Sequence, residues 1–235
     1  MIDYHCHILP GLDDGCRDLP ESLAMAQVLV TAGFQEVYCT PHCMHGVYDN
    51  TPEQVQSAVA ELQQQVDREG ILLKLHPGME YYLDEYFIQK LINAQPLGET
   101  NLLLIESSVQ VDPEQLKNLV FQVARKGYIP LLAHPERYDF LLPQVASVGV
   151  FQNIKKIFSH QAPEVDVTDP SLMVALQQQG CQFQGNLGSF AGQYGNTVKQ
   201  RARQLQQGKF YRFFGSDGHR PEPTARFLEK AKDIY

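Results

Sequence analysis

Two histidines near the start of the chain, His5 and His7, have the spacing of side chains that share one face of a strand. Alternate side chains of a strand point to opposite sides, so both imidazoles face one way and Cys6 faces the other. Imidazole nitrogens bind borderline cations such as zinc and iron, and carboxylates bind harder ones such as manganese. The pair therefore predicts part of a metal site.

Further side chains of types that ligate metals lie just beyond this first strand or follow the ends of other apparent strands. They are Asp13 and Asp14, His42, Glu80, Glu106, His134, Asp217 and His219. Any one of them has an ordinary explanation as a loop or capping residue, but the pattern recurs at six of seven predicted strand ends. The set exceeds the roughly six oxygen or nitrogen ligands that one cation takes. The sequence thus predicts more than one divalent cation, and manganese, iron and zinc all suit the ligands.

The five cysteines are expected to be reduced, because their number is odd and no secretory signal opens the chain. Cys39 and Cys43, in Cys-Thr-Pro-His-Cys, resemble half of a zinc knuckle. No second pair at suitable spacing is present, so buried apolar thiols are the favoured interpretation.

Strand-like and helix-like segments alternate along the chain and position these side chains. Strands are expected over residues 1–7, 36–39, 71–76, 101–105, 128–133, 181–186 and 210–215. Helices are expected over 20–32, 52–69, 84–93, 113–126, 169–179, 196–207 and from 221 onwards, with Asp112 as a cap and Pro113 in the first turn. This alternation predicts an α/β fold with a parallel sheet, in which the chemistry lies at the carboxyl ends of the strands.

Length, composition and net charge narrow the class of protein to which the chain can belong. The 235 residues, 43% of them hydrophobic, suit one domain over residues 1–235. A net charge of −8 argues against nucleic acid or an anionic membrane surface as the partner. No apolar run is long enough for membrane insertion and no signal pattern is present, so a cytoplasmic location is expected.

The ligand set resembles the PHP (polymerase and histidinol phosphatase) superfamily. The opening His-Cys-His-Ile-Leu-Pro-Gly-Leu-Asp-Asp-Gly, the string His-Pro-Glu-Arg-Tyr and Asn-Leu-Gly-Ser-Phe-Ala-Gly are similar to its bacterial metal-dependent tyrosine-protein phosphatases of capsule and exopolysaccharide loci. The resemblance runs from residue 1 to about residue 220. It implies a distorted (β/α)7 TIM-like barrel with two to three divalent cations, manganese first and iron or zinc as alternatives.

Carried over by residue, the resemblance implies three metal sites. One is formed by His5, His7, Glu80 and Asp217, a second by Glu80, Glu106 and His134, and a third by Asp14, His42 and His219. Asp13 is adjacent to Asp14 and is also available. Arg137 corresponds to the phosphate-binding arginine, and a guanidinium fork fits a phosphoryl group. Arg137, Asp14 and His42 are assigned to catalysis, and Arg220 and Arg226 are candidates for a further substrate-binding arginine.

The resemblance leads to a hypothesis of phosphomonoester hydrolysis, in which a hydroxide held by the metals attacks phosphorus. The expected substrate is a phosphotyrosine protein, with the tail of an autophosphorylating bacterial tyrosine kinase as partner. A cysteine-dependent phosphatase is disfavoured, because none of the five cysteines is followed by an arginine at the required spacing. Histidinol phosphate or another small phosphoester, a nuclease, and a non-catalytic metal-stabilised binding module stay open as alternatives.

We also make predictions for two further segments of the chain. Tyr81, Tyr82 and Tyr86 are expected to pack the barrel rim or to stack on a substrate ring. Residues 138–168 match no motif, and they include His160 and part of the Glu164–Asp169 stretch; a structural extra is expected there, with a lid or partner surface as alternatives.

Overall fold

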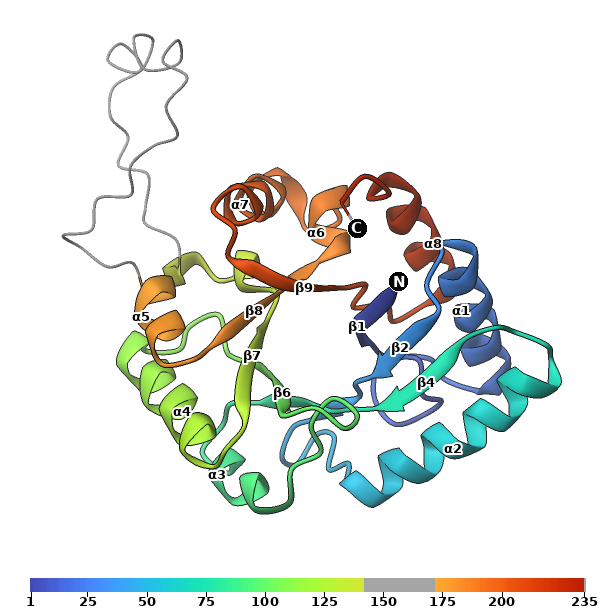
Figure 1. Ribbon diagram of the computed structural model, residues 1–235, viewed down its shortest axis with the longest axis horizontal. Coiled ribbons are helices and arrows are strands. Elements are labelled where there is room, and N and C mark those ends of the chain that lie inside the picture. The colour runs from blue at the N-terminus through green and yellow to red at the C-terminus, as the bar shows by residue number, and fades with distance from the viewer. Residues whose placement is uncertain (142–171, 235) are drawn as a thin grey trace, which may run out of the picture.

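The computed structural model describes residues 1–141 and 172–234, in which parallel strands form a ring enclosed by helices (Figure 1). In one run of the ring, β1 (Ile2–Cys6) pairs with β2 (Glu36–Cys39), which pairs with β4 (Lys74–Pro77). The other run follows the order β3 (His42–Cys43), β5 (Glu80–Tyr82), β6 (Leu102–Glu106), β7 (Ile129–Ala133), β8 (Gln182–Asn186) and β9 (Tyr211–Gly215).

The two runs join into one barrel. Only residues 40–41 separate β2 from β3, and only residues 78–79 separate β4 from β5, so each pair acts as one interrupted strand. The ring closes where His7 N donates to Gly218 O at 3.0 Å and Asp217 N donates to His5 O at 2.7 Å. A side chain at Gly215 would place its Cβ 2.5 Å from that of His5, so only glycine allows this approach. The predicted distorted barrel is confirmed, with seven strand positions among the residues that the structure describes.

The helices cover the outside of the ring, as the βα alternation predicts (Figure 1). They are α1 (Leu19–Thr31), α2 (Pro52–Arg68), α3 (Phe87–Lys90), α4 (Pro113–Arg125), α5 (Leu172–Gln178), α6 (Leu187–Ala191), α7 (Gly195–Gln207) and α8 (Pro221–Lys230), with 3-10 turns at Leu91–Asn93, Pro135–Arg137 and Asp139–Leu141. Asp112 caps α4 as predicted, because its side chain accepts from the amides of Glu114 and Gln115.

Several element boundaries differ from the expected ones. The helix predicted over 84–93 is a single turn followed by a 3-10 turn, and β4 begins at Lys74 rather than at residue 71. The glycine-rich turn after β8 contains the short helix α6, which Asn186 caps through its side-chain oxygen. Most of the 138–168 segment, with His160 and the Glu164–Asp169 stretch, lies outside the described residues.

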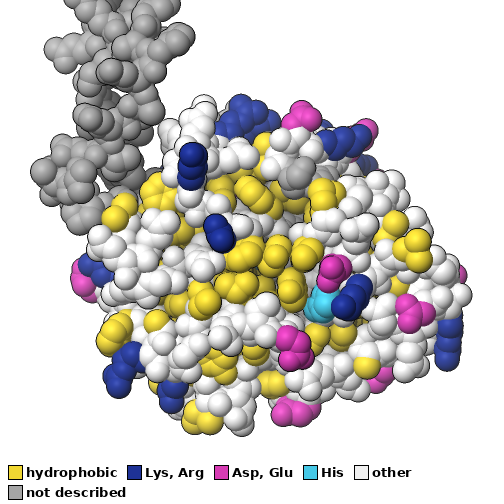
Figure 2. All heavy atoms as spheres, viewed as in Figure 1, with side chains coloured by type: hydrophobic (Ala, Val, Ile, Leu, Met, Phe, Trp, Pro, Cys, Tyr) yellow, Lys and Arg dark blue, Asp and Glu magenta, His cyan; other side chains and the backbone are white. Residues whose placement is uncertain are grey.

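Hydrophobic side chains fill the barrel at the amino ends of its strands. The ring of Tyr4 lies 5.3 Å from that of Tyr38 and 4.5 Å from that of Phe213, and these pack with Leu104 and Leu131. Figure 2 shows hydrophobic side chains gathered over the centre of the ring. A larger apolar cluster lies between strands and helices, where each fully buried leucine or valine stabilises the fold by about 1.5–3 kcal/mol. The cluster of buried histidines lies instead toward the carboxyl ends of the strands.

Within the described ranges, no helix combines the length and the apolar character needed to cross a membrane.

Candidate metal centre

All nine predicted ligands lie together at the carboxyl ends of the strands, within overlapping groups. Five of them are almost fully buried, although they are polar: His5, His7, Glu80, His134 and Asp217 lie at 6% exposure or less, as does their neighbour Asn186. His134 and Asp217 follow β7 and β9 with positive φ angles of 37° and 52°. Such angles are unfavourable for residues other than glycine and concentrate at functional sites.

The first group consists of His5, His7, Glu80 and Asp217. The Nε2 atoms of the two histidines are 3.0 Å apart. Glu80 Oε2 lies 3.1 Å from His5 Nε2 and 3.4 Å from His7 Nε2, and Asp217 Oδ1 lies 3.4 and 3.3 Å from them. Ligands about 2.0–2.2 Å from one ion stand roughly 3.0–3.5 Å apart, so this spacing fits a shared cation.

The orientation of the two imidazoles supports the same reading. His7 Nδ1 lies 2.7 Å from Asp13 Oδ2, and His5 Nδ1 lies 3.1 Å from Gln184 Oε1. Both partners are acceptors, so each ring carries its proton on Nδ1 and presents the Nε2 lone pair inward. Two nitrogen lone pairs and two carboxylate oxygens repel one another at such distances. A cation that lies among them removes this repulsion.

The second group centres on Glu80 and Glu106. His42 Nδ1 lies 3.1 Å from Glu80 Oε2 and 3.1 Å from Glu106 Oε1. His134 Nε2 lies 3.2 Å from Glu80 Oε1 and 4.0 Å from Glu106 Oε2. Glu80 Oε2 and His42 Nδ1 are buried and make no hydrogen bond with the described residues, in spite of these short distances. Buried polar atoms without hydrogen bonds are rare, and a bound cation accounts for them.

The third group is more open to solvent. Asp14 Oδ1 lies 3.5 Å from His42 Nε2 and 3.4 Å from His219 Nε2, and the ring of His219 stacks on that of His7 at 4.0 Å. Asp14 rather than Asp13 faces this group, because Asp13 is turned toward His7 and accepts from the His42 amide at 2.9 Å. His42 thus has one nitrogen toward each of the second and third groups.

The electrostatics of the cluster favour positive charge. Burial disfavours the charged imidazole of His42, but Glu106 and Glu80 outweigh burial and raise its pKa to about 10. Burial likewise opposes ionisation of Glu80 and Asp217, yet the surrounding histidines hold both pKa values well below the usual carboxyl range. The carboxylates are therefore ionised at neutral pH and attract cations.

Arg137 lies beside the first group. Its Nη1 donates to Asp217 Oδ2 at 3.2 Å, and its guanidinium carbon lies 4.7 Å from the centre of the Tyr194 ring. Asn186 Nδ2 donates to the same Asp217 oxygen at 2.7 Å. Burial lowers the pKa of Arg137, but Asp217 outweighs it and raises the pKa above its usual value. Arg137 is thus a permanent cation held at the edge of the cluster.

The two other candidate arginines lie apart from each other. Arg220 donates from Nη1 to the backbone oxygen of His219 at 3.0 Å and lines a cavity of about 310 Å³ beside the cluster. The other residues that line it are Gln193, Tyr194, Asp217, His219, Pro223, Thr224 and Phe227. Arg226 is exposed on α8 and pairs with Glu222 one turn earlier, so the structure does not bring it to the metal ligands.

Sequence reasoning missed the residues that orient the ligands. Gln184 shares the inner face of β8 with Asn186, so period-two alternation could have found it. Tyr194 had no signal, because it lies in an irregular turn. The five cysteines are buried and free, and Cys6 points away from the ligands as predicted, toward Gly218 O. Tyr81 is buried, and its ring packs 6.2 Å from that of Phe87.

Comparison with known proteins places these features in a family. Residues 1–166 match the family described as capsular polysaccharide synthesis, CpsB/CapC. The tyrosine-protein phosphatase YwqE of Bacillus subtilis is 33% identical over 93% of this chain and 77% of its own length. The tyrosine-protein phosphatase CpsB of Streptococcus agalactiae is 25% identical over the whole chain and 89% of its own length.

Solved structures agree with this placement. A crystal structure from work on YwqE of Bacillus subtilis and CpsB of Streptococcus pneumoniae, described as metal-dependent tyrosine phosphatases, matches with a TM-score of 0.75 at 31% identity. The match covers 98% of this chain and 87% of that one. A histidinol phosphate phosphatase from Lactococcus lactis matches at 14% identity with a TM-score of 0.55, over 98% and 93% of the two chains, and shows a shared fold.

Proposed function

Because the chain belongs to the CpsB/CapC family, we propose that it is a metal-dependent protein-tyrosine phosphatase. The observation that carries the proposal is the convergence of His5, His7, Glu80 and Asp217 with Arg137 alongside. Cation ligands next to a fixed guanidinium form a site suited to a phosphoryl group.

We assign the cations to the three groups described above, with Glu80 shared by the first and second. Imidazole and carboxylate ligands without thiolate suit manganese, iron and zinc alike. Manganese is the first choice from the resemblance to the family, with iron or zinc as alternatives. Bound cations supply an activated water as nucleophile and offset charge that develops on the phosphoryl oxygens. The open third group, with Asp14, His42 and His219, faces solvent and is the proposed side of substrate entry.

The protein's own residues bind and orient the phosphoryl group. Arg137 donates N–H groups to its non-bridging oxygens, and Asp217 Oδ2 and the Tyr194 ring hold the guanidinium in place for this contact. Asp13 and Gln184 fix the tautomers of His7 and His5. Phenolate leaves readily, since its conjugate acid has a pKa of about 10.

The cavity next to Asp217 and His219 suits an aromatic substrate. Tyr194, Pro223 and Phe227 provide apolar walls, and Arg220 lies at the polar side. We propose that the phenyl ring of phosphotyrosine lies here, with the peptide chain leading outward. A flexible tail of a bacterial tyrosine kinase is the proposed natural partner, because an extended segment can place its tyrosine in such an opening.

The test compares a phosphotyrosyl peptide, a phosphoseryl peptide and histidinol phosphate as substrates of the metal-loaded protein. The proposal predicts turnover of the phosphotyrosyl peptide at a kcat/KM at least tenfold above the other two, and loss of that turnover in Asp217→Ala. Preferred hydrolysis of histidinol phosphate would assign a small-molecule phosphatase instead. No hydrolysis of any of the three, with metal bound, would leave a binding module.

A further inference from the structure

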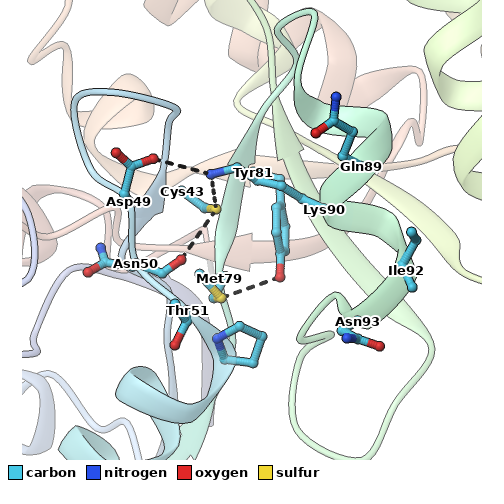
Figure 3. Close-up of a pocket in the computed structure, with 11 residues that line it drawn as sticks. Cys43, Asp49, Asn50, Thr51, Met79, Tyr81, Gln89, Lys90, Ile92 and Asn93 are labelled. Atoms are coloured by element: carbon cyan, nitrogen blue, oxygen red, sulfur yellow. Dashed lines mark hydrogen bonds and ion pairs between the residues drawn. The ribbon is translucent and has the colours of Figure 1, made fainter.

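Two features next to the metal centre take no part in the proposed function. One is a cavity of about 370 Å³ on the outer side of β3 and β5 (Figure 3). Its cationic side chain, Lys90, lies 3.2 Å from Cys43 Sγ and 3.9 Å from Asp49 Oδ1, so this charge is already paired. The other feature is the carboxyl group of Glu136, which is fully buried although it belongs to none of the three ligand groups.

Glu136 directly precedes Arg137 in the chain, but its side chain bonds to the neighbouring strands β8 and β9. Its Oε1 accepts from the Asn186 amide at 3.0 Å, and its Oε2 accepts from the Tyr211 hydroxyl at 2.8 Å. Burial raises the pKa of Tyr211 and Glu136 raises it further, so the hydroxyl keeps its proton and donates it. A buried carboxyl group is costly unless its oxygens accept hydrogen bonds, and here both do. The carboxyl group thus links the turn after β7 to two further strands.

The backbone of this turn is strained. His134 has a φ angle of 37°, in the left-handed region that is unfavourable for residues other than glycine. Such a conformation persists only where the surrounding structure holds it. His134 N donates to Gln184 O at 2.9 Å, which holds the start of the turn, and the two hydrogen bonds of Glu136 hold its middle. The backbone position of the next residue, Arg137, therefore depends on both attachments.

The guanidinium of Arg137 is connected to the same strand end by a second path. Asn186, whose amide donates to Glu136, also donates from its side-chain Nδ2 to Asp217 Oδ2 at 2.7 Å. That carboxylate oxygen accepts from Arg137 Nη1 at 3.2 Å. The backbone of Arg137 is thus anchored to Asn186 through Glu136, and its guanidinium is anchored to Asn186 through Asp217. The two paths together fix how the arginine extends from the turn to the cluster.

We propose that Glu136 is a positioning residue, which holds the turn so that Arg137 reaches the phosphoryl group of the substrate. The inference rests on the proposed phosphatase function. Without the carboxyl group the turn keeps only its attachment through His134, and the backbone of Arg137 shifts relative to Asp217. A displacement of about 1 Å in a group that orients the substrate can lower the rate about 100-fold. Because Glu136 acts through Arg137, its removal matters only while the guanidinium is present.

A double-mutant cycle with Arg137 tests this assignment. We expect Glu136→Ala to lower kcat/KM on a phosphotyrosyl peptide about 10–100-fold, with the metal content of the wild type. In an Arg137→Ala background the same change should lower kcat/KM by less than about twofold. Glu114→Ala, a change at an exposed side chain of α4, should alter kcat/KM in neither background. An equal loss in the two backgrounds would show a general structural role for Glu136 and would overturn the proposal.

Two milder variants decide the question even where Glu136→Ala does not fold. Glu136→Gln keeps an oxygen for the Asn186 amide and gains an N–H that can donate to the Tyr211 oxygen, so kcat/KM should stay within about threefold of the wild type. Tyr211→Phe removes one hydroxyl group and should lower kcat/KM about 3–10-fold, again only while Arg137 is present.

The outcomes separate this inference from the function on which it rests. Full activity in Tyr211→Phe, or the same loss with and without Arg137, would overturn the role of Glu136 and leave the phosphatase function in place. A metal-loaded wild type that hydrolyses no phosphotyrosyl peptide would overturn the proposed function, and this inference with it.

Discussion

Arg137 Nη1 donates to Asp217 Oδ2 at 3.2 Å, while the other oxygen of the same carboxylate faces the Nε2 atoms of two histidines. One carboxylate thus holds both the guanidinium and the imidazole cluster. Its Oδ2 also accepts from Asn186 at 2.7 Å, so it keeps a partner if the arginine is removed. The almost fully buried Asp217 therefore links the position of Arg137 to that of the imidazole cluster.

Removal of that guanidinium should impair chemistry without loss of metal. We expect Arg137→Ala to lower kcat on a phosphotyrosyl peptide about 100-fold or more, which is typical for the loss of one donor to a developing charge. Metal content, measured by mass spectrometry of the purified variant, should equal that of the wild type. Arg226→Ala is the matched control, since Arg226 is exposed and pairs with Glu222, and its kcat should not change.

Asp13 should control metal affinity although it is not placed as a ligand. Its Oδ2 lies 2.7 Å from His7 Nδ1 and also accepts from the His42 amide, and its Oδ1 accepts from the Gly15 amide. Asparagine at this position offers one acceptor instead of two, so Asp13→Asn should weaken metal binding about 10–100-fold. Competition with a chelator measures this, and Asp112→Asn, at the cap of α4, should leave the affinity unchanged.

Metal removal should lower thermal stability. A ligand at about 100 times its Kd stabilises the folded state by about 2.7 kcal/mol, which corresponds to roughly 5–10 °C in Tm for a chain of this length. We expect a chelator to lower Tm by that amount and manganese or zinc to restore it. Calorimetry measures the Tm with and without metal. An identical Tm in the two samples would contradict binding of the cations to the folded protein.

Cys181 should make stability depend on pH in the alkaline range. Burial raises the pKa of this thiol from 9.0 to about 12. Between pH 9 and 12 the unfolded chain loses the thiol proton and the folded chain keeps it, so the free energy of unfolding falls as pH rises. The contribution is at most about 1.4 kcal/mol per pH unit. Cys181→Ser removes it, and urea titrations at pH 8 and 10 should show a shallower decline in the variant.

Most of the site could be predicted from the types of residue that follow the strand ends. Parallel strands bring their carboxyl ends to one place, so His5, His42, Glu80 and Asp217 meet although they are far apart in sequence. The choice between Asp13 and Asp14 was open, because it depends on how the loop folds back on His7. A Cβ at Gly15 would lie 2.5 Å from that of His7, which shows how closely the loop packs there.

Other features depend on tertiary contacts that periodicity does not encode. The strands β3 and β5 contain two and three residues and follow a break in the preceding strand, so no alternation was visible. Arg220 and Arg226 looked equivalent, but α8 directs Arg226 outward. Gln184 and Tyr194 act through other residues, and their chemical types alone suggested no role.

The most direct test of the account measures metal content and phosphotyrosyl peptide hydrolysis in the same samples, before chelation, after chelation and after metal is restored. We expect at least two equivalents of divalent metal per chain in the active protein, with hydrolysis lost and regained in step with that metal. Full hydrolysis by protein that contains no metal would contradict it.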